Sequence, residues 1–334
     1  MPRISPSTRV GPALALVWMA SLFCAPASFA SSPAQSPDSR HREIARRGLD
    51  LLMNGDPDGA IEVFYDIRRD DPQSPLGYLL EADATWWKIY FATGNLIDPD
   101  VFDVVSSSTT PYDSHFESLI HAAINKSEAR IRAGQDVARN YLYEGMAYAL
   151  EARLTGLRGK DLPTARAGKK MRTLLLKALE LDPQLTDAYL GVGIYNYFVD
   201  TLPTIIKILK FFIGLPSGSR AQGLEQLQNA ADHGELTRGE AGFYLAKDFS
   251  RGNERQYAKS LELFEKLRDE YPRNPLWTLM VGSLQIRLGH DAEGDTLYRE
   301  VYKLTKGEKS EVQQAIYRAV KHALELRHPD EKFD

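Results

Sequence analysis

The chain has 334 residues, of which 43% are hydrophobic and 26% are charged, and its formal net charge is −4 at pH 7. This mildly acidic balance, with no basic tract, argues against a nucleic-acid partner. A single cysteine, Cys24, excludes an intrachain disulfide and a metal site built from several cysteines.

Residues 1–30 have the pattern of a cleaved secretory signal peptide. Two arginines precede an uncharged apolar run at 11–23, and small residues follow, so that cleavage is expected after Ala27 or Ala30. The alternative is an N-terminal membrane anchor, but the run is shorter than the roughly 20 residues that a spanning helix needs. We therefore expect export to the periplasm, with the serine- and proline-rich residues 31–40 as a flexible linker.

From residue 41 to residue 327 the pattern is helical, because apolar residues recur at intervals of three and four and no strand-like alternation is found. In the first module, small residues, an aromatic residue and a proline follow at intervals of seven, five, four and eight: Gly48, Gly55, Ala60, Phe64 and Pro72. These intervals resemble the frame of the tetratricopeptide repeat, a helix–turn–helix of about 34 residues. In this frame the first glycine lets two helices approach closely, and the proline ends the second helix.

Parts of the same frame recur along the chain, for example at Gly282, Gly289, Gly294 and Tyr298. Residues 98–114, rich in serine, threonine, aspartate and proline, interrupt the frame as an insertion. We therefore predict an all-α fold, a right-handed tetratricopeptide-type solenoid of helical hairpins with a C-terminal capping helix. The predicted modules lie near residues 41–74, 75–140, 141–185, 186–234, 235–274 and 275–308, followed by the cap at 310–327 and a tail at 328–334.

A narrower resemblance lies in residues 191–231. There, a helix with glycine and aromatic residues leads into a leucine–proline pair, a short apolar helix with lysines, and a restart that contains arginine and glycine. The residues concerned are Gly191, Gly193, Tyr195, Leu202, Pro203, Lys207, Lys210, Gly214, Arg220, Gly223 and Leu224. The segment resembles the eukaryotic inclusion-body clearance family, which implies a helical-repeat fold and an adaptor-type role. The export signal departs from that family, so a mitochondrial or nuclear role is not carried over.

The sequence shows no catalytic constellation. Its histidines form no metal-binding pair at helical spacing, no serine lies in a nucleophile-elbow motif, and the predicted mature chain lacks a cysteine nucleophile. The glycine-rich stretch 214–220 could present backbone N–H groups to an anion or be a plain connection between helices. We therefore predict that the protein is not an enzyme and has no cofactor, no metal site and no small-molecule substrate.

Two aromatic clusters are candidates for partner binding: Trp86, Trp87 and Tyr90 in one, and Tyr195, Tyr197 and Phe198 in the other. Both fall in predicted first helices of a pair, which line the concave face of tetratricopeptide solenoids. There they would form a groove for an extended or helical peptide. The alternative is core packing between helices, which is the usual role of aromatic side chains in a solenoid.

The most apolar stretch of the predicted mature chain is a short helix at 203–213. Its eleven residues would span roughly 16 Å, about half of a bilayer core, so the helix cannot cross a membrane. It suits burial between repeats or a place at a membrane interface, with four side chains as the candidate contacts: Lys207, Lys210, Phe211 and Phe212.

These expectations combine into a non-enzymatic scaffold or adaptor of the cell envelope that binds a protein or peptide on the concave face of the solenoid. The alternative is a protein of the membrane surface that docks through the 203–213 helix.

Overall fold

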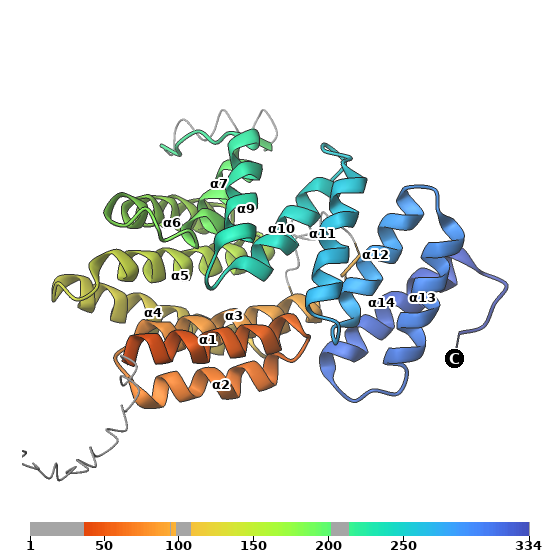
Figure 1. Cartoon of the computed structure of the whole chain (residues 1–334), viewed down its shortest axis with the longest axis horizontal. Coiled ribbons are helices and arrows are strands. Elements are labelled where there is room, and N and C mark those ends of the chain that lie inside the picture. The colour runs from red at the N-terminus through yellow and green to blue at the C-terminus, as the bar shows by residue number, and fades with distance from the viewer. Residues whose placement is uncertain (1–36, 94, 98–107, 202–213, 334) are drawn as a thin grey trace, which may run out of the picture. The chain divides into compact units, whose positions relative to one another are not determined.

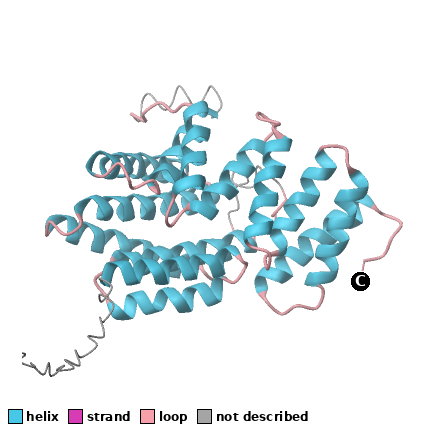
Figure 2. Cartoon of the chain, in the orientation of Figure 1, coloured by secondary structure: helices cyan, strands magenta, loops and turns pink. Residues whose placement is uncertain are grey.

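The computed structural model describes residues 37–93, 95–97, 108–201 and 214–333. Within these residues the chain forms thirteen α-helices and no strand. Figure 2 shows the helices joined by loops. Each helix packs against the next one along the chain, which confirms the predicted all-α solenoid of helical hairpins. The predicted signal peptide at 1–30 and the short helix at 203–213 lie outside the described residues.

The described helices follow one another as successive pairs with one closing helix at the end (Figure 1). They are α1 (Pro37–Met53) with α2 (Pro57–Asp70), α3 (Pro75–Ala92) with α4 (Asp113–Arg132), α5 (Val137–Leu157) with α6 (Asp161–Leu181), α7 (Ala188–Thr201) with α9 (Arg220–His233), α10 (Arg238–Ser250) with α11 (Tyr257–Glu270), α12 (Pro275–Arg287) with α13 (Asp291–Thr305), and finally α14 (Glu311–Arg327). None of these helices is both long enough and apolar enough to cross a membrane.

The first helix begins inside the stretch 31–40 that the sequence analysis assigns to a flexible linker. Pro37 suits a first helical turn, because its fixed φ is helical and its missing N–H would have no partner there. Arg40 forms an ion pair of 3.1 Å with Asp70 on α2, and His41 is buried. The helix bounds therefore correct the prediction of a linker up to residue 40, because α1 begins at Pro37.

The glycine–aromatic contacts of the repeat frame are present in the first and the sixth pair. A Cβ on Gly48 of α1 would overlap the ring of Phe64 on α2, which is fully buried. Gly282 of α12 faces Tyr298 of α13 in the same way, with a ring atom 2.9 Å from the place that a Cβ would take. Gly55 lies in the connection between α1 and α2 and has a φ of +83°, a conformation that glycine adopts without strain.

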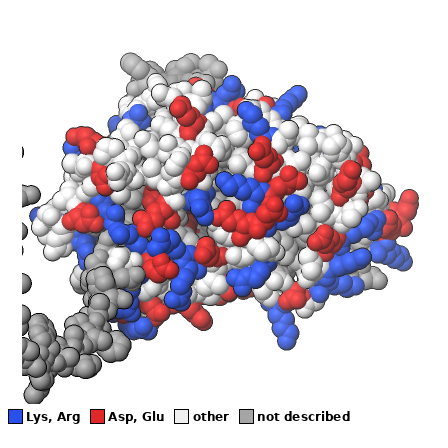
Figure 3. Space-filling view, in the orientation of Figure 1, with Lys and Arg blue, Asp and Glu red and all other residues white. Residues whose placement is uncertain are grey.

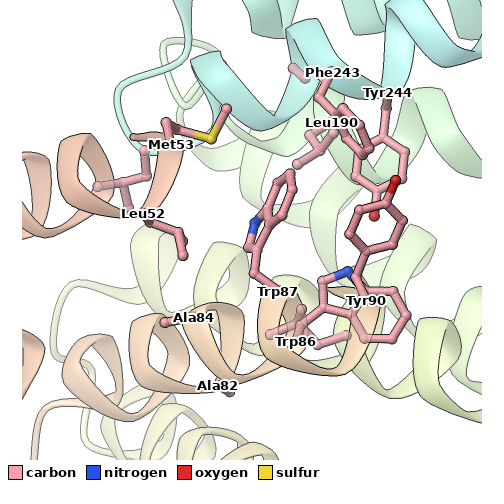
Figure 4. Close-up of a cluster of buried hydrophobic side chains, with 14 of the residues drawn as sticks. Leu52, Met53, Ala82, Ala84, Trp86, Trp87, Tyr90, Leu190, Phe243 and Tyr244 are labelled. Carbon is pink, nitrogen blue, oxygen red and sulfur yellow. The ribbon is translucent and has the colours of Figure 1, made fainter. Parts of the chain in front are cut away.

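The first helices of several pairs also meet one another, and we call the contact of α1 and α3 with α10 and α12 the inner interface. The Trp87 ring on α3 lies 5.1 Å from Phe243 on α10 and 6.2 Å from Trp277 on α12, measured between centroids (Figure 4). The side chains of Asn274 and Trp277 each donate a hydrogen bond of 3.0 Å to the carbonyl oxygen of Met53. The chain's own side chains therefore fill much of the face that would be concave in an open solenoid.

The closing helix α14 packs on α3 as well as on its neighbours α12 and α13. Near this contact the Tyr112 hydroxyl donates a hydrogen bond to the carboxylate of Glu311, the first residue of α14. The ammonium group of Lys88 on α3 lies over the Tyr112 ring, 4.6 Å from its centroid. The predicted cap thus covers the last repeat and also contacts the second pair of the solenoid.

Candidate functional site

The aromatic residues predicted to bind a partner belong mostly to the core. Five of the six are at most 4% exposed: Trp86, Trp87, Tyr90, Tyr195 and Tyr197. Phe198 is half-buried, with the Arg251 guanidinium 5.0 Å from its ring centroid. The predicted open groove of aromatic side chains is therefore corrected in favour of core packing. The first cluster is buried because α3 packs against α10 and α12 at the inner interface. The sequence of a single module does not show this contact between distant modules.

The glycine-rich stretch 214–220 is a connection that is held to α7 by hydrogen bonds. The Tyr195 hydroxyl donates a hydrogen bond of 2.8 Å to the Pro216 carbonyl oxygen. At the start of α9, the backbone N–H of Arg220 donates to the Asp200 carboxylate at 2.9 Å. A carboxylate of the chain itself thus occupies the place that an anion would take. The four candidates of the apolar helix lie outside the described residues: Lys207, Lys210, Phe211 and Phe212.

Beside the inner interface, a cavity of about 330 Å³ remains, which we call the α1–α10 cavity. Leu49 and Met53 of α1 supply apolar walls, Asp83 and Trp87 come from α3, and Glu240 comes from the first turns of α10. Its volume is at the lower end of the range of about 300–1,000 Å³ for small-ligand pockets. We take this cavity as the candidate functional site, because it combines apolar walls with a few buried polar groups.

Two carboxylates that line the cavity, Asp83 and Glu240, face a cation that does not itself line it. The Arg153 guanidinium on α5 forms an ion pair with Glu240, lies 3.9 Å from Asp83, and stacks over the Tyr244 ring at 4.8 Å. The side chains of Arg153 and Glu240 are each 10% exposed, and that of Asp83 is 14% exposed. Burial, and then the negative charge of Glu240, raise the pKa of Asp83 well above its usual range, against the opposing effect of Arg153. These two carboxylates therefore share one guanidinium.

Two residues that line the cavity each have a fully buried polar atom without a hydrogen-bond partner. One is the indole Nε1 of Trp87, a donor, and the other is the carboxyl oxygen Oδ1 of Asp83. Figure 4 shows the nitrogen-bearing edge of Trp87 turned toward Leu52 and Met53, both of which line the cavity. Because leaving a buried polar group unsatisfied costs about 1–3 kcal/mol, such pairs are uncommon and call for an explanation.

The charged residues at the cavity are paired mostly with groups around it. Arg46 forms an ion pair of 2.6 Å with Glu43, and Arg238 pairs with Glu270. Burial, and then the charge of Glu270, raise the pKa of Asp50, which lines the cavity. Since these arginines already face acids, the cavity favours a cation over an anion. Across the visible face of the molecule, by contrast, acidic and basic side chains are interspersed (Figure 3).

The loop that closes one side of the cavity is held by Asp187, which the sequence analysis did not single out. Its buried carboxylate accepts hydrogen bonds from the backbone N–H groups of Leu236 at 2.8 Å and Thr237 at 3.0 Å, and from the Thr237 hydroxyl at 2.9 Å. Thr237 directly precedes α10, so these bonds fix where α10 begins. They thereby position Glu240, one turn further on, in the cavity wall.

Sequence reasoning also missed Asp83, Arg153 and Glu240. Seventy residues separate the first two and 87 the last two, and each lies in a helix where an isolated charge is usually solvated. The one available signal was Asp83 itself, one of two carboxylates, with Glu81, inside the largely apolar helix α3. That signal indicates a buried charge but does not identify its partners.

No protein-family model matches the chain, and no curated protein matches it significantly in sequence. The resemblances to the tetratricopeptide repeat and to the inclusion-body clearance family therefore stay predictions. In the part of the chain that the structure describes, no group of three or more histidine, cysteine, aspartate or glutamate side chains is arranged to hold a metal ion. The arrangement at the α1–α10 cavity offers hydrogen bonds, charge and apolar contact to a bound group.

Proposed function

We propose that the protein is a non-enzymatic scaffold or adaptor of the cell envelope that binds a protein or peptide. The observation that supports this most is the α1–α10 cavity, where apolar side chains of α1 and charged side chains of α1, α3 and α10 border the same space. A partner would insert one side chain or one chain end between these walls. The rest of the partner would lie on the surface around α1 and α10.

This proposal changes the mode of binding expected from the sequence. An open concave groove would accept a peptide along its whole length, whereas the filled inner interface leaves a local cavity. Binding at one buried point, surrounded by polar and charged residues, is the usual arrangement of an interface hot spot. The helical pairs then serve as the rigid support of that point.

The test is affinity capture of envelope proteins by the mature chain, followed by mass spectrometry. A Leu49→Trp variant narrows the cavity from α1, and a Tyr65→Trp variant makes a comparable change at a side chain of α2 that is 54% exposed. We expect the same partner with the wild type and with Tyr65→Trp, and at least a tenfold lower yield with Leu49→Trp. Equal capture by all three proteins would place the partner elsewhere, and turnover in a substrate screen would contradict a non-enzymatic role.

A further inference from the structure

We propose that the outer side of α6 docks on an anionic phospholipid surface. Six side chains of this helix form the docking surface, which we call the α6 face: Leu162, Arg166, Lys169, Lys170, Leu176 and Lys177. No residue of α6 lines the α1–α10 cavity, so the inference goes beyond the proposed function and does not depend on it.

The α6 face is the solvent side of a helix whose other side belongs to the solenoid core. α6 packs on α5 and α7 (Figure 1). Its buried residues on that side are Ala167, Gly168, Met171, Leu174, Leu175 and Ala178. Arg166, Lys169 and Leu176 follow one another at intervals of three and seven, which places them together on the opposite side of the helix. Lys170 and Lys177 lie beside them, one position further along the chain.

Cations predominate on α6, in contrast to the second helices of the other described pairs. Those helices carry no net positive charge, whereas α6 has five basic and two acidic side chains. The two acids lie at the ends of the helix: Asp161 is its first residue, and Glu180 pairs with Lys177 at 2.7 Å. Because neutral residues separate most of the cations in the sequence, they form no basic tract and gather only on the helix surface.

The chain itself neutralises only part of this charge. Lys170 lies 3.6 Å from the carboxylate of Glu144 on α5. In the described part of the chain, no acid forms an ion pair with Arg166 or Lys169, and both side chains are exposed. The α6 face therefore presents positive charge that a negatively charged surface would complement.

The leucines favour a membrane over an acidic protein as the occupant of this face. Of the six most exposed large hydrophobic side chains in the described part of the chain, three belong to α6: Leu162, Leu176 and Leu181. At a lipid interface the cations meet phosphate groups and the leucines enter the boundary of the acyl chains. An acidic protein segment would meet the cations alone and leave the leucines in water.

The expected strength follows from the charges. Each lysine or arginine near an anionic lipid surface strengthens binding by about fivefold at low salt. Two of the four cations already face an acid, at 3.6 Å and 2.7 Å, so their contribution is smaller. We therefore expect at least a tenfold preference for anionic over neutral vesicles.

Vesicle flotation with the mature chain tests the inference. The probes are vesicles of equal parts phosphatidylglycerol and phosphatidylcholine, and vesicles of phosphatidylcholine alone, both at about 0.05 M NaCl. We expect at least tenfold more bound protein on the anionic vesicles. In about 0.5 M NaCl this binding should fall at least fivefold, because salt screens exposed charges.

Two double variants with the same change in net charge connect the binding to α6. Arg166→Glu with Lys169→Glu should weaken the binding to anionic vesicles at least tenfold. Lys303→Glu with Arg318→Glu reverses two exposed cations on α13 and α14 and should leave the binding within about twofold of the wild type. Thermal unfolding of each variant verifies that it is folded.

A third double variant separates a lipid surface from an acidic protein chain. Leu162→Ser with Leu176→Ser should weaken vesicle binding about two- to tenfold and leave any binding of poly-glutamate unchanged. Unchanged vesicle binding in this variant, together with poly-glutamate binding as tight as that of the vesicles, would overturn the assignment to lipid.

Three further outcomes would overturn the inference. They are no binding to anionic vesicles, equal binding to the two kinds of vesicle, and equal binding by the α6 and the control charge-reversal variants. None of them bears on the capture experiment, which depends on Leu49 in the α1–α10 cavity. Failure of the inference and failure of the proposed function are therefore distinguishable.

Discussion

Trp87 and Trp277 are in contact across the inner interface, yet their indole N–H groups differ. That of Trp277 donates a hydrogen bond of 3.0 Å to the Met53 carbonyl oxygen, whereas that of Trp87 is buried next to a cavity and has no partner. Around Trp277 the interface is packed with rings, including Phe243 at 5.9 Å and Phe264 at 6.4 Å between centroids. The same residue type thus completes its hydrogen bonding on one side of the interface and leaves a buried donor unsatisfied on the other.

The largest loss in the free energy of unfolding is expected for Trp277→Ala. The substitution removes a side chain with no exposed surface and its contacts with three other aromatic rings. We expect a loss of about 3–5 kcal/mol in the free energy of unfolding, measured by urea denaturation. The control is Tyr65→Ala on α2, at a side chain that is 54% exposed, with an expected change within about 0.5 kcal/mol. Equal losses in both variants would show that the inner interface does not stabilise the fold.

The next largest effect is expected for Arg153→Met, which removes the cation that Asp83 and Glu240 share. Losing one partner of a buried ion pair typically costs about 3–5 kcal/mol, because the other charge stays buried and uncompensated. Here Asp83, with its raised pKa, can take up a proton and relieve part of that cost, so we expect about 2–4 kcal/mol. Urea denaturation at pH 5 and pH 8 measures it, and the loss should be larger at pH 8. A loss independent of pH would contradict the coupling between these groups.

The third prediction compares the two tryptophans directly. Trp277→Phe and Trp87→Phe remove similar volumes, but only the first removes a hydrogen bond within the protein. We therefore expect Trp277→Phe to lower the free energy of unfolding by about 1 kcal/mol more than Trp87→Phe does. Equal values would mean that the N–H of Trp87 has a partner in solution, such as a water molecule.

The smallest effect, and one of opposite sign, is expected for Asp83→Asn. Because the pKa of Asp83 is raised in the folded state, the folded protein binds more protons than the unfolded chain between the two pKa values. The wild type therefore loses stability as the pH rises from the unfolded-state pKa, near 3.9, through the folded-state pKa. The amide carries no charge, so the variant should be up to about 1 kcal/mol more stable than the wild type at pH 8, and less so at pH 5.

Urea unfolding of both proteins at the two pH values measures this difference. A destabilised Asp83→Asn protein at pH 8 would show that the carboxylate is ionised and bound by Arg153 more strongly than its separation of 3.9 Å indicates.

The fold was predictable to the extent that it depends on local patterns. The contact of Gly48 with Phe64 and the turn at Gly55 both follow from intervals within one module. The inner interface was not predictable, because small rotations between successive pairs add up along the chain before α3 meets α12. For the same reason the aromatic side chain of Trp87 was expected in an open groove, and the group of Asp83, Arg153 and Glu240 was not recognised. Their proximity is a product of the whole solenoid.

The hydrogen bonds to the Met53 carbonyl oxygen have a consequence for the order of folding. They join positions 221 and 224 residues apart in the chain, through Asn274 and Trp277. In an open array each repeat depends only on its neighbours, so an end can be removed at little cost to the rest. Here the first hairpin cannot complete its bonds until α12 has been synthesised, and contacts of such long range slow folding. A chain truncated before residue 274 therefore lacks its last repeats and also leaves its first one unfinished.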